Sequence, residues 1–297
     1  MDDPRISDLI NTASGVGIDL IGFPSDEGVR RNGGRTGASK APQSIAEAFY
    51  KLTPHPEYYH IHAPFIQSSQ ALQLIPQNSS MEAHQIALGK EVAKSLKKGR
   101  YPVILGGGHE TAYGHFLAYT HQSDMVSIVN IDAHADVRQL KKGKSHSGSP
   151  FRQAWEHRKN ILESYQVLGL NPASCAAKHL EYVNSCGAYS FENRLSSKLL
   201  ENTLNTIQSP QIMATMDMDV VHQAEAPGVS ATNPSGISAS LWIDLAFIFG
   251  QHPRVSSLDI SEVNPKYDRD QATIKLAALT IWKFSLGLAL RTASVSL

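Results

Sequence analysis

Six short apolar runs alternate with longer segments of helical periodicity along this chain of 297 residues. Such alternation is typical of a parallel sheet with helices covering both faces. We therefore expect an α/β fold with three layers, α/β/α, and a mostly parallel central sheet. We also expect one catalytic domain over residues 1–297, in which residues 1–15 form an N-terminal extension. The expected strands are 17–23, 102–106, 125–132, 165–170, 212–217 and 255–260, and the expected helices are 42–52, 81–98, 111–121, 151–162, 193–207, 240–250 and 270–290.

Three short polar clusters directly follow three of these expected strands. They read LGGGHE at 105–110, NIDAHAD at 130–136 and MDMD at 216–219. In extended chain, alternate side chains point to one face, so the acidic and imidazole groups within a cluster can converge. Since sites on parallel sheets lie outside the carboxyl ends of the strands, the clusters should also meet one another. The candidate metal ligands are His109, Asp132, His134, Asp136, Asp217 and Asp219.

Each cluster alone has an ordinary interpretation as a solvated turn, a polar loop or a strand edge. Together they predict bound cations, because unpaired carboxylates within ~4–6 Å of each other repel and raise one another's pKa. Four carboxylates and two imidazoles without a thiolate suit Mn²⁺ better than structural Zn²⁺, and they exclude an iron–sulfur cluster. Six side chains are too many for one ion with an open position. Two ions ~3.5–4 Å apart, with a bridging hydroxide between them, are therefore expected.

The same clusters resemble those of the ureohydrolase superfamily, which includes arginases and agmatinases. The segments at 216–236 and 256–265 add to the resemblance, which covers residues 17–265. It implies an arginase-like fold, a hydrolase with two Mn²⁺ per subunit, and a homo-oligomer. It further implies that one ion is held by His109, Asp132, Asp136 and Asp217. The other ion would be held by Asp132, His134, Asp217 and Asp219, so that Asp132 and Asp217 bridge the two.

Within that superfamily the chain most resembles the formimidoylglutamases, on the segments at 25–38, 132–138 and 146–154. That family hydrolyses N-formimidoyl-L-glutamate to L-glutamate and formamide in histidine degradation. Arg138 carries the narrower resemblance, because a guanidinium here would bind a carboxylate of a dianionic substrate and repel cationic agmatine. The other expected substrate contacts, each of which could instead be a surface salt bridge or a solvated loop residue, are Arg152, Asn32 and Arg35.

The resemblance also implies three catalytic residues. Glu262 matches the acid that orients the substrate, although a strand-end acid can simply cap a loop. Asp136 can accept a hydrogen bond from the attacking hydroxide and so orient it. Arginases carry a proton-handling His in a His-Gly-x-Pro pattern. Here HSGSP aligns Ser147 with that position, so either His146 or Ser147 could act. The surrounding loop, residues 139–150, is expected to form a flexible rim of the site.

Composition narrows the possible partners. Lys plus Arg and Asp plus Glu both number 27, so no overall field attracts nucleic acid or an acidic membrane. A small-molecule substrate is expected instead. The N-terminal segment lacks a basic flank and an apolar core, and no run of eighteen apolar residues occurs, so we expect a cytoplasmic protein. Cys175 and Cys186 are expected to be free thiols.

Two alternatives stay open. One is another ureohydrolase activity, on agmatine, guanidinobutyrate or arginine, and Arg138 is the residue that discriminates against it. The other is a catalytically silent metal-binding relative, against which the complete set of six ligands and Glu262 argues.

Overall fold

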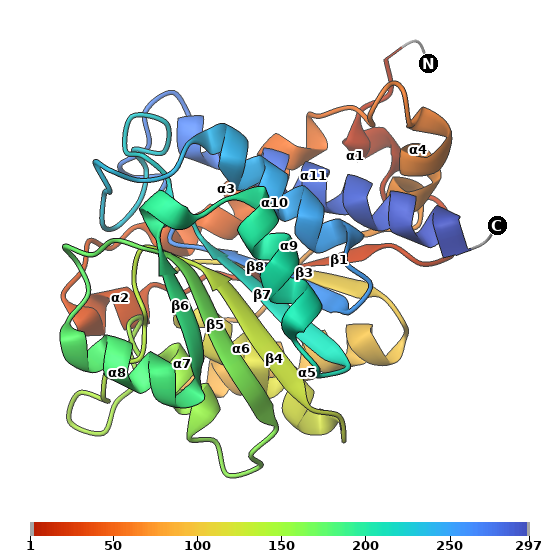
Figure 1. Ribbon diagram of the computed structural model, residues 1–297. Helices are drawn as coiled ribbons and strands as arrows, with labels where there is room; N and C mark the ends of the chain where they lie inside the picture. The colour runs from red at the N-terminus through yellow and green to blue at the C-terminus, as the bar shows by residue number, and fades with distance from the viewer. Residues whose placement is uncertain (1–2, 296–297) are drawn as a thin grey trace.

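The computed structural model describes residues 3–295 and contains one eight-stranded sheet in which every pair of neighbours is parallel (Figure 1). The strand order is β2-β1-β3-β8-β7-β4-β5-β6, and helices cover both faces. The expected three-layer α/β/α class is therefore confirmed. The strands are β1 Ile18–Phe23, β2 Gln70–Leu74, β3 Tyr101–Gly106, β4 Val126–Ile131, β5 Leu162–Leu170, β6 Gly187–Phe191, β7 Gln211–Asp217 and β8 Val255–Ser261.

All six expected strands are present, and the two that sequence patterning missed lie at the edges of the sheet. Strand β2 is mostly exposed, and none of the residues of β6 is buried. An edge strand pairs on one side only and needs no continuous apolar run, so the pattern that identifies a central strand is absent there.

The seven expected helices are present with changed ends, and the four short helices α1, α2, α4 and α8 were not predicted. The prediction of a helix at 151–162 is wrong at its C-terminal end: α7 stops at Trp155, and Leu162 already begins β5. The helices are α1 Ile6–Leu9, α2 Glu27–Asn32, α3 Ala41–Tyr50, α4 Tyr59–Gln67, α5 Met81–Lys97, α6 Thr111–Leu117, α7 Pro150–Trp155, α8 Ala177–Cys186, α9 Ser197–Thr206, α10 Ala239–Gln251 and α11 Ala272–Val295.

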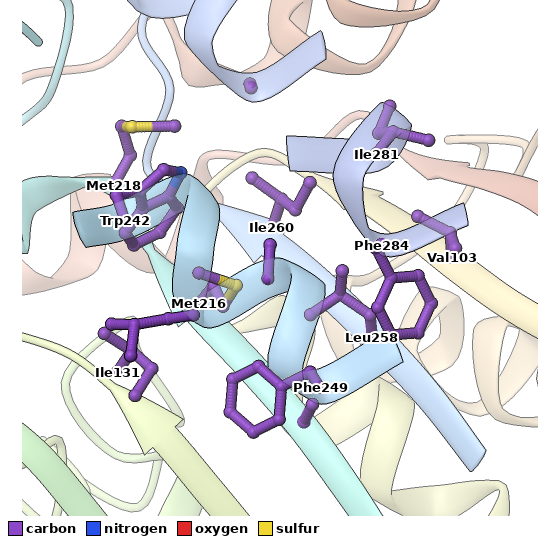
Figure 2. Close-up of a cluster of buried hydrophobic side chains, with 14 of the residues drawn as sticks. Val103, Ile131, Met216, Met218, Trp242, Phe249, Leu258, Ile260, Ile281 and Phe284 are labelled. Atoms are coloured by element: carbon purple, nitrogen blue, oxygen red, sulfur yellow. The ribbon is translucent and has the colours of Figure 1, made fainter. Parts of the chain in front are cut away.

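The core has two parts, one on each face of the sheet. Helices α3, α9, α10 and α11 cover one face, and α5, α6, α7 and α8 cover the other. Figure 2 shows the first part, a cluster that includes Met216 of β7, Ile260 of β8 and Trp242 of α10. Burying a large apolar side chain contributes about 1.5–3 kcal/mol. The central strands that carry the candidate ligands are thus fixed on a rigid platform.

Two terminal segments belong to this core. Ile6 of α1, within the expected N-terminal extension, is fully buried and donates its amide to Leu52 O. Helix α11 is long and apolar enough to cross a membrane, but 72% of its apolar window is buried. It packs against α10, α3 and α4. Its apolar composition is therefore that of a helix buried in the core.

Candidate metal centre

The three ligand clusters meet at the carboxyl ends of four neighbouring central strands. His109 follows β3, Asp132 to Asp136 follow β4, Asp217 ends β7, and Glu262 follows β8. These strands are adjacent in the order β3-β8-β7-β4, so residues up to 153 positions apart come into hydrogen-bonding contact. The convergence expected from the sequence is confirmed.

A glycine turn brings His109 back over the end of β3. A Cβ on Gly107 would lie 1.9 Å from the carbonyl oxygen of Ser25, and one on Gly108 would lie 2.2 Å from Glu110 Oε2. Only glycine allows backbone to approach so closely. The two glycines therefore allow close packing of the turn that carries His109, which we call the ligand turn.

The first ligand set surrounds the Nδ1 atom of His109. This atom lies 3.0 Å from Asp136 Oδ2, 3.0 Å from Asp217 Oδ2 and 3.2 Å from Asp132 Oδ2. The other ring nitrogen, Nε2, lies 3.0 Å from the hydroxyl of Thr215. Ligand atoms of these four residues, which the family resemblance assigns to one ion, fall within 4.8 Å of one another.

The second set consists of Asp132, His134 and Asp219. His134 Nδ1 lies 3.0 Å from Asp219 Oδ2 and 3.7 Å from Asp132 Oδ1. Because Asp132 contributes to both sets, its position fits the predicted bridge. Asp217 groups only with the first set, and its Oδ1 accepts the Asp219 amide. The bridging role of Asp217 stays a prediction.

Electrostatics favour cations at this position. Burial, reinforced by Asp219 and Asp132, raises the pKa of Asp217 well above its ordinary value. Burial alone would lower the pKa of His109, but the surrounding carboxylates raise it well above normal. Within residues 3–295, buried Asp219 Oδ1 and Glu262 Oε2 have no hydrogen-bond partner. Crowded, partly orphaned oxygens with imidazole nitrogens fit two Mn²⁺ ions.

A cavity of about 160 Å³ opens directly onto the ligands. Its wall includes two predicted substrate residues, Arg138 and Asn32, and also the predicted Glu262. Ser147 and Ser230 add hydroxyl groups to the wall. The lining residues are Val29, Asn32, Gly34, His134, Asp136, Arg138, Ser147, Asp217, Asp219, Ser230, Ala231 and Glu262.

Arg138 is an available cation at this cavity. Its Nη1 donates a weak hydrogen bond of 3.4 Å to Asn32 Oδ1, and Arg138 forms no ion pair within the described residues 3–295. Asn32 also donates to Ser147 Oγ and accepts from Lys141 Nζ. An exposed guanidinium without a carboxylate partner is suited to bind an anionic ligand.

Arg35 and Arg152 do not line the cavity. Arg35 donates to the carbonyls of Ser230 and Val229, at 3.0 and 2.7 Å, so it supports the wall rather than contacting its contents. Arg152 donates to Val137 O and to Glu156, and its guanidinium stacks on a tyrosine ring. The structure therefore corrects the prediction of Arg152 as a carboxylate clamp.

His146 is held inside its own loop. Its side chain is buried, Nδ1 accepts the Gly148 amide at 3.2 Å, and Nε2 lies 3.0 Å from Gln139 O. With both ring nitrogens engaged and no place in the cavity wall, His146 does not fit the predicted proton shuttle. Ser147 lines the cavity instead. Residues 145–150 are buried, so this part of the loop is packed rather than freely exposed.

Glu262 and Asp136 are held in the left-handed region, with φ of 63° and 46°. Strained backbone at non-glycine residues is common in functional sites. Glu262 Oε1 accepts the His109 amide at 2.9 Å. Burial, with the nearby charge of Asp219, raises the pKa of Glu262 to about 7. The carboxylate is therefore coupled to the ligand turn.

Glu110 is a site neighbour that the sequence analysis missed. It is buried, its Oε1 accepts from Ser25 Oγ and the Gly28 amide, and burial raises its pKa to about 8. It lies in the LGGGHE cluster beside a ligand. Its position next to His109 was the signal that could have found it.

Comparisons with known proteins agree with this geometry. The family model described as the arginase family matches residues 16–287. A formimidoylglutamase of Geobacillus thermodenitrificans is 37% identical over 269 residues, which cover 87% of this chain and 80% of that protein. A formimidoylglutamase of Clostridium tetani is 31% identical, covering 93% and 84%.

A solved structure with a similar fold is that of Trypanosoma cruzi formiminoglutamase with Mn²⁺. It superposes with a TM-score of 0.89 at 28% identity, covering 98% of this chain and all of that one. An arginase from Bacillus subtilis, at 22% identity and a TM-score of 0.76, shares the fold and covers 90% of this chain and 98% of that one.

Proposed function

The chain belongs to the arginase family, and from this membership, its relatives and its site we infer that it hydrolyses N-formimidoyl-L-glutamate to L-glutamate and formamide. It is a metal-dependent hydrolase of C–N bonds in linear amidines, with two Mn²⁺ per chain. The structural observation that carries the substrate assignment is the unpaired guanidinium of Arg138 at the cavity that opens onto the ligands.

The residues around His109 and His134 would hold the two ions. When bound, the ions supply a hydroxide nucleophile near neutral pH and stabilise negative charge as it develops in the transition state. Asp132 contributes oxygens to both ligand sets. Asp136, in the cavity wall, would accept a hydrogen bond from this nucleophile and so orient it.

The remaining residues bind and orient the substrate. A formimidoyl group is an amidine, which is cationic near neutral pH, and the unpartnered Oε2 of Glu262 in the cavity wall can accept its N–H. Arg138 binds a carboxylate of the glutamate portion. The hydroxide oxygen adds to the amidine carbon. As this oxygen becomes the carbonyl oxygen of formamide, the bond from the carbon to the glutamate nitrogen breaks, and the proton that the oxygen loses passes to that nitrogen. The products are glutamate and formamide.

A substrate panel tests this function. Mn²⁺-loaded enzyme is offered N-formimidoyl-L-glutamate, agmatine, guanidinobutyrate and arginine, and formamide or urea release is measured. We expect formamide release from the first and at most traces of urea from the others. Hydrolysis of agmatine without hydrolysis of formimidoylglutamate would show that the substrate assignment is wrong.

Arg138→Asn tests the carboxylate contact separately. A charge-assisted hydrogen bond contributes about 1.5–3 kcal/mol, and exposure at the rim puts this one at the lower end. We expect KM to rise about 10-fold with kcat within about 3-fold. Arg158→Gln, which removes the same charge from an exposed loop outside the cavity wall, is the matched control. An unchanged KM in Arg138→Asn would refute the contact.

Homo-oligomeric assembly and a cytoplasmic location also stay proposals, supported by the family resemblance and by the sequence respectively. Light scattering on purified protein tests the first.

A further inference from the structure

A central strand of this protein carries an unusual line of buried polar side chains. Along β8, Ser257, Asp259 and Ser261 are fully buried on one face, while Leu258 and Ile260 are buried on the other. A strand covered on both sides is ordinarily apolar on both. A buried carboxylate is costly unless hydrogen bonds compensate it. Asp259 therefore requires an explanation.

Hydrogen bonds link Asp259 to the metal centre on one side. In the β7–β8 register, Thr215 is the direct partner of Asp259. The hydroxyl of Thr215 donates to Asp259 Oδ1 at 2.7 Å, and the same hydroxyl lies 3.0 Å from His109 Nε2. One threonine thus connects a buried carboxylate to a metal-ligand imidazole.

A second arm reaches Asp259 from helix α6. His115 Nδ1 lies 2.7 Å from Asp259 Oδ2, and His115 Nε2 lies 2.6 Å from Ser257 Oγ. Tyr119, in the 3₁₀ turn after α6, continues the arm, with its hydroxyl 2.5 Å from Ser257 Oγ. All of these side chains are buried, so water does not compete for their hydrogen bonds.

The available protons set the direction of the bonds that join His115, Asp259, Thr215 and His109. An ionised carboxylate only accepts, so Thr215 O–H and His115 Nδ1–H must both donate to Asp259. The single proton of Thr215 is then used, and its oxygen can only accept from His109. When His109 binds an ion as a neutral imidazole, it must therefore carry its proton on Nε2, which leaves the Nδ1 lone pair for the ion.

We propose that Asp259 and His115 are positioning residues of the metal centre, which act through Thr215 to keep His109 in the tautomer that presents Nδ1 to the ion. Outer hydrogen bonds of this kind orient metal-binding histidines and raise their basicity. His115 lies six residues after His109 in the same turn–helix segment. The segment that supplies the ligand His109 also supplies His115, which helps to position it. The inference rests on the metal centre and is independent of the identity of the substrate.

Asp259→Asn is the primary test. An amide of nearly the same shape can turn its NH₂ toward Thr215, whose proton can then turn to His109 Nε2. That arrangement favours the Nδ1–H tautomer, which cannot bind the ion. We expect a 10–100-fold loss of Mn²⁺ affinity at one of two sites, measured by equilibrium dialysis and by electron paramagnetic resonance of the titrated protein. Activity is not needed for this readout.

Three variants separate positioning from packing. His115→Leu removes the donor and should weaken Mn²⁺ binding. His115→Asn keeps a donor near the Nδ1 position and should largely restore it. Tyr119→Phe changes only the far end of the arm and should leave Mn²⁺ affinity within about 3-fold of wild type.

A double-mutant cycle tests the route. If Asp259 acts through Thr215, Asp259→Asn should cost little further affinity in a Thr215→Val background, whereas Thr215→Ser should behave as wild type. These threonine variants also test the proposal if Asp259→Asn fails to fold. Wild-type affinity in folded Asp259→Asn, His115→Leu and Thr215→Val would overturn it. Failure of the wild-type protein to bind two Mn²⁺ would instead overturn the function proposed above.

Discussion

Replacing Asp217 by Asn should have opposite effects on the metal-free and the metal-loaded protein. Asp217 is buried, its Oδ2 lies 3.0 Å from His109 Nδ1, and its Oδ1 accepts the Asp219 amide. An Asn can keep that second hydrogen bond and offer its NH₂ to a neutral His109. The substitution therefore removes a charge and a ligand while leaving local geometry intact.

The size of the stability change in the metal-free protein follows from the crowding of the carboxylates. Ligand atoms of the first set lie within 4.8 Å of one another. Two charges at that separation repel by about 3.5 kcal/mol at an effective dielectric constant of 20. Partial protonation and the positive charge of His109 offset part of this repulsion. We expect metal-free Asp217→Asn to be about 1–2 kcal/mol more stable than metal-free wild type, or a few degrees in Tm.

Excess Mn²⁺ should make wild type more stable than Asp217→Asn. Each ion at 100 times its dissociation constant stabilises the native state by about 2.7 kcal/mol, so two ions add about 5 kcal/mol to wild type. Asp217→Asn should gain at most half of this and lose activity. Differential scanning calorimetry with and without Mn²⁺ measures both effects.

Asp19→Asn is the matched control for this experiment. It breaks a mostly buried ion pair of 2.6 Å with Arg100, away from the ligands, and should destabilise the protein equally with and without Mn²⁺. If metal-free Asp217→Asn were clearly less stable than metal-free wild type, the carboxylates would be stable without cations. The reasoning that leads from crowding to a metal site would then be wrong.

Three further outcomes are expected. Glu262→Gln should lower kcat/KM about 10–100-fold, since it weakens one charge-assisted contact, and should leave the Mn²⁺ stoichiometry unchanged. Steady-state kinetics and metal analysis measure the two quantities, and a loss of Mn²⁺ would contradict a role in substrate binding alone. In Gly107→Ala the new Cβ would lie 1.9 Å from a backbone carbonyl oxygen, so the free energy of unfolding in urea should fall by about 3 kcal/mol. Gly99→Ala is the control: φ is 67° there and no atom lies within 4 Å of the added Cβ, so the free energy should fall by only about 1 kcal/mol. Burial lowers the pKa of His62 to about 4 from 6.5. The unfolded state therefore binds the proton more readily than the native state does. Between pH 7 and pH 5 the free energy of unfolding of metal-free wild type should fall by about 2 kcal/mol, a loss that His62→Gln should not show. Urea titrations at each pH measure this free energy, and an equal change with pH in both proteins would disprove the effect.

The sequence predicted the central strands and the metal ligands because both depend on local pattern. A strand such as β4 is a continuous apolar run, and the alternation of Asp132, His134 and Asp136 directly after it fixes a common face. The edge strand β2 carries no such run, and pairing with β1 at long range decides its conformation.

Loop residues could not be predicted in the same way. Whether His146 or Ser147 faces the cavity depends on a backbone path set by contacts with Asn32 and Gln139, which are invisible in a linear motif. The role of Asp259 was missed for a related reason. An acid inside an apolar strand acquires meaning only when register places it beside Thr215.

This protein is expected to hydrolyse the formimidoyl amidine of glutamate at a two-ion centre. The most direct test of this expectation is a titration of metal-free enzyme with Mn²⁺ in which bound metal and formamide release from N-formimidoyl-L-glutamate are followed together. The structure predicts that activity rises with occupancy and saturates at two ions per chain. Full activity without metal, or two bound ions without formamide release, would contradict it.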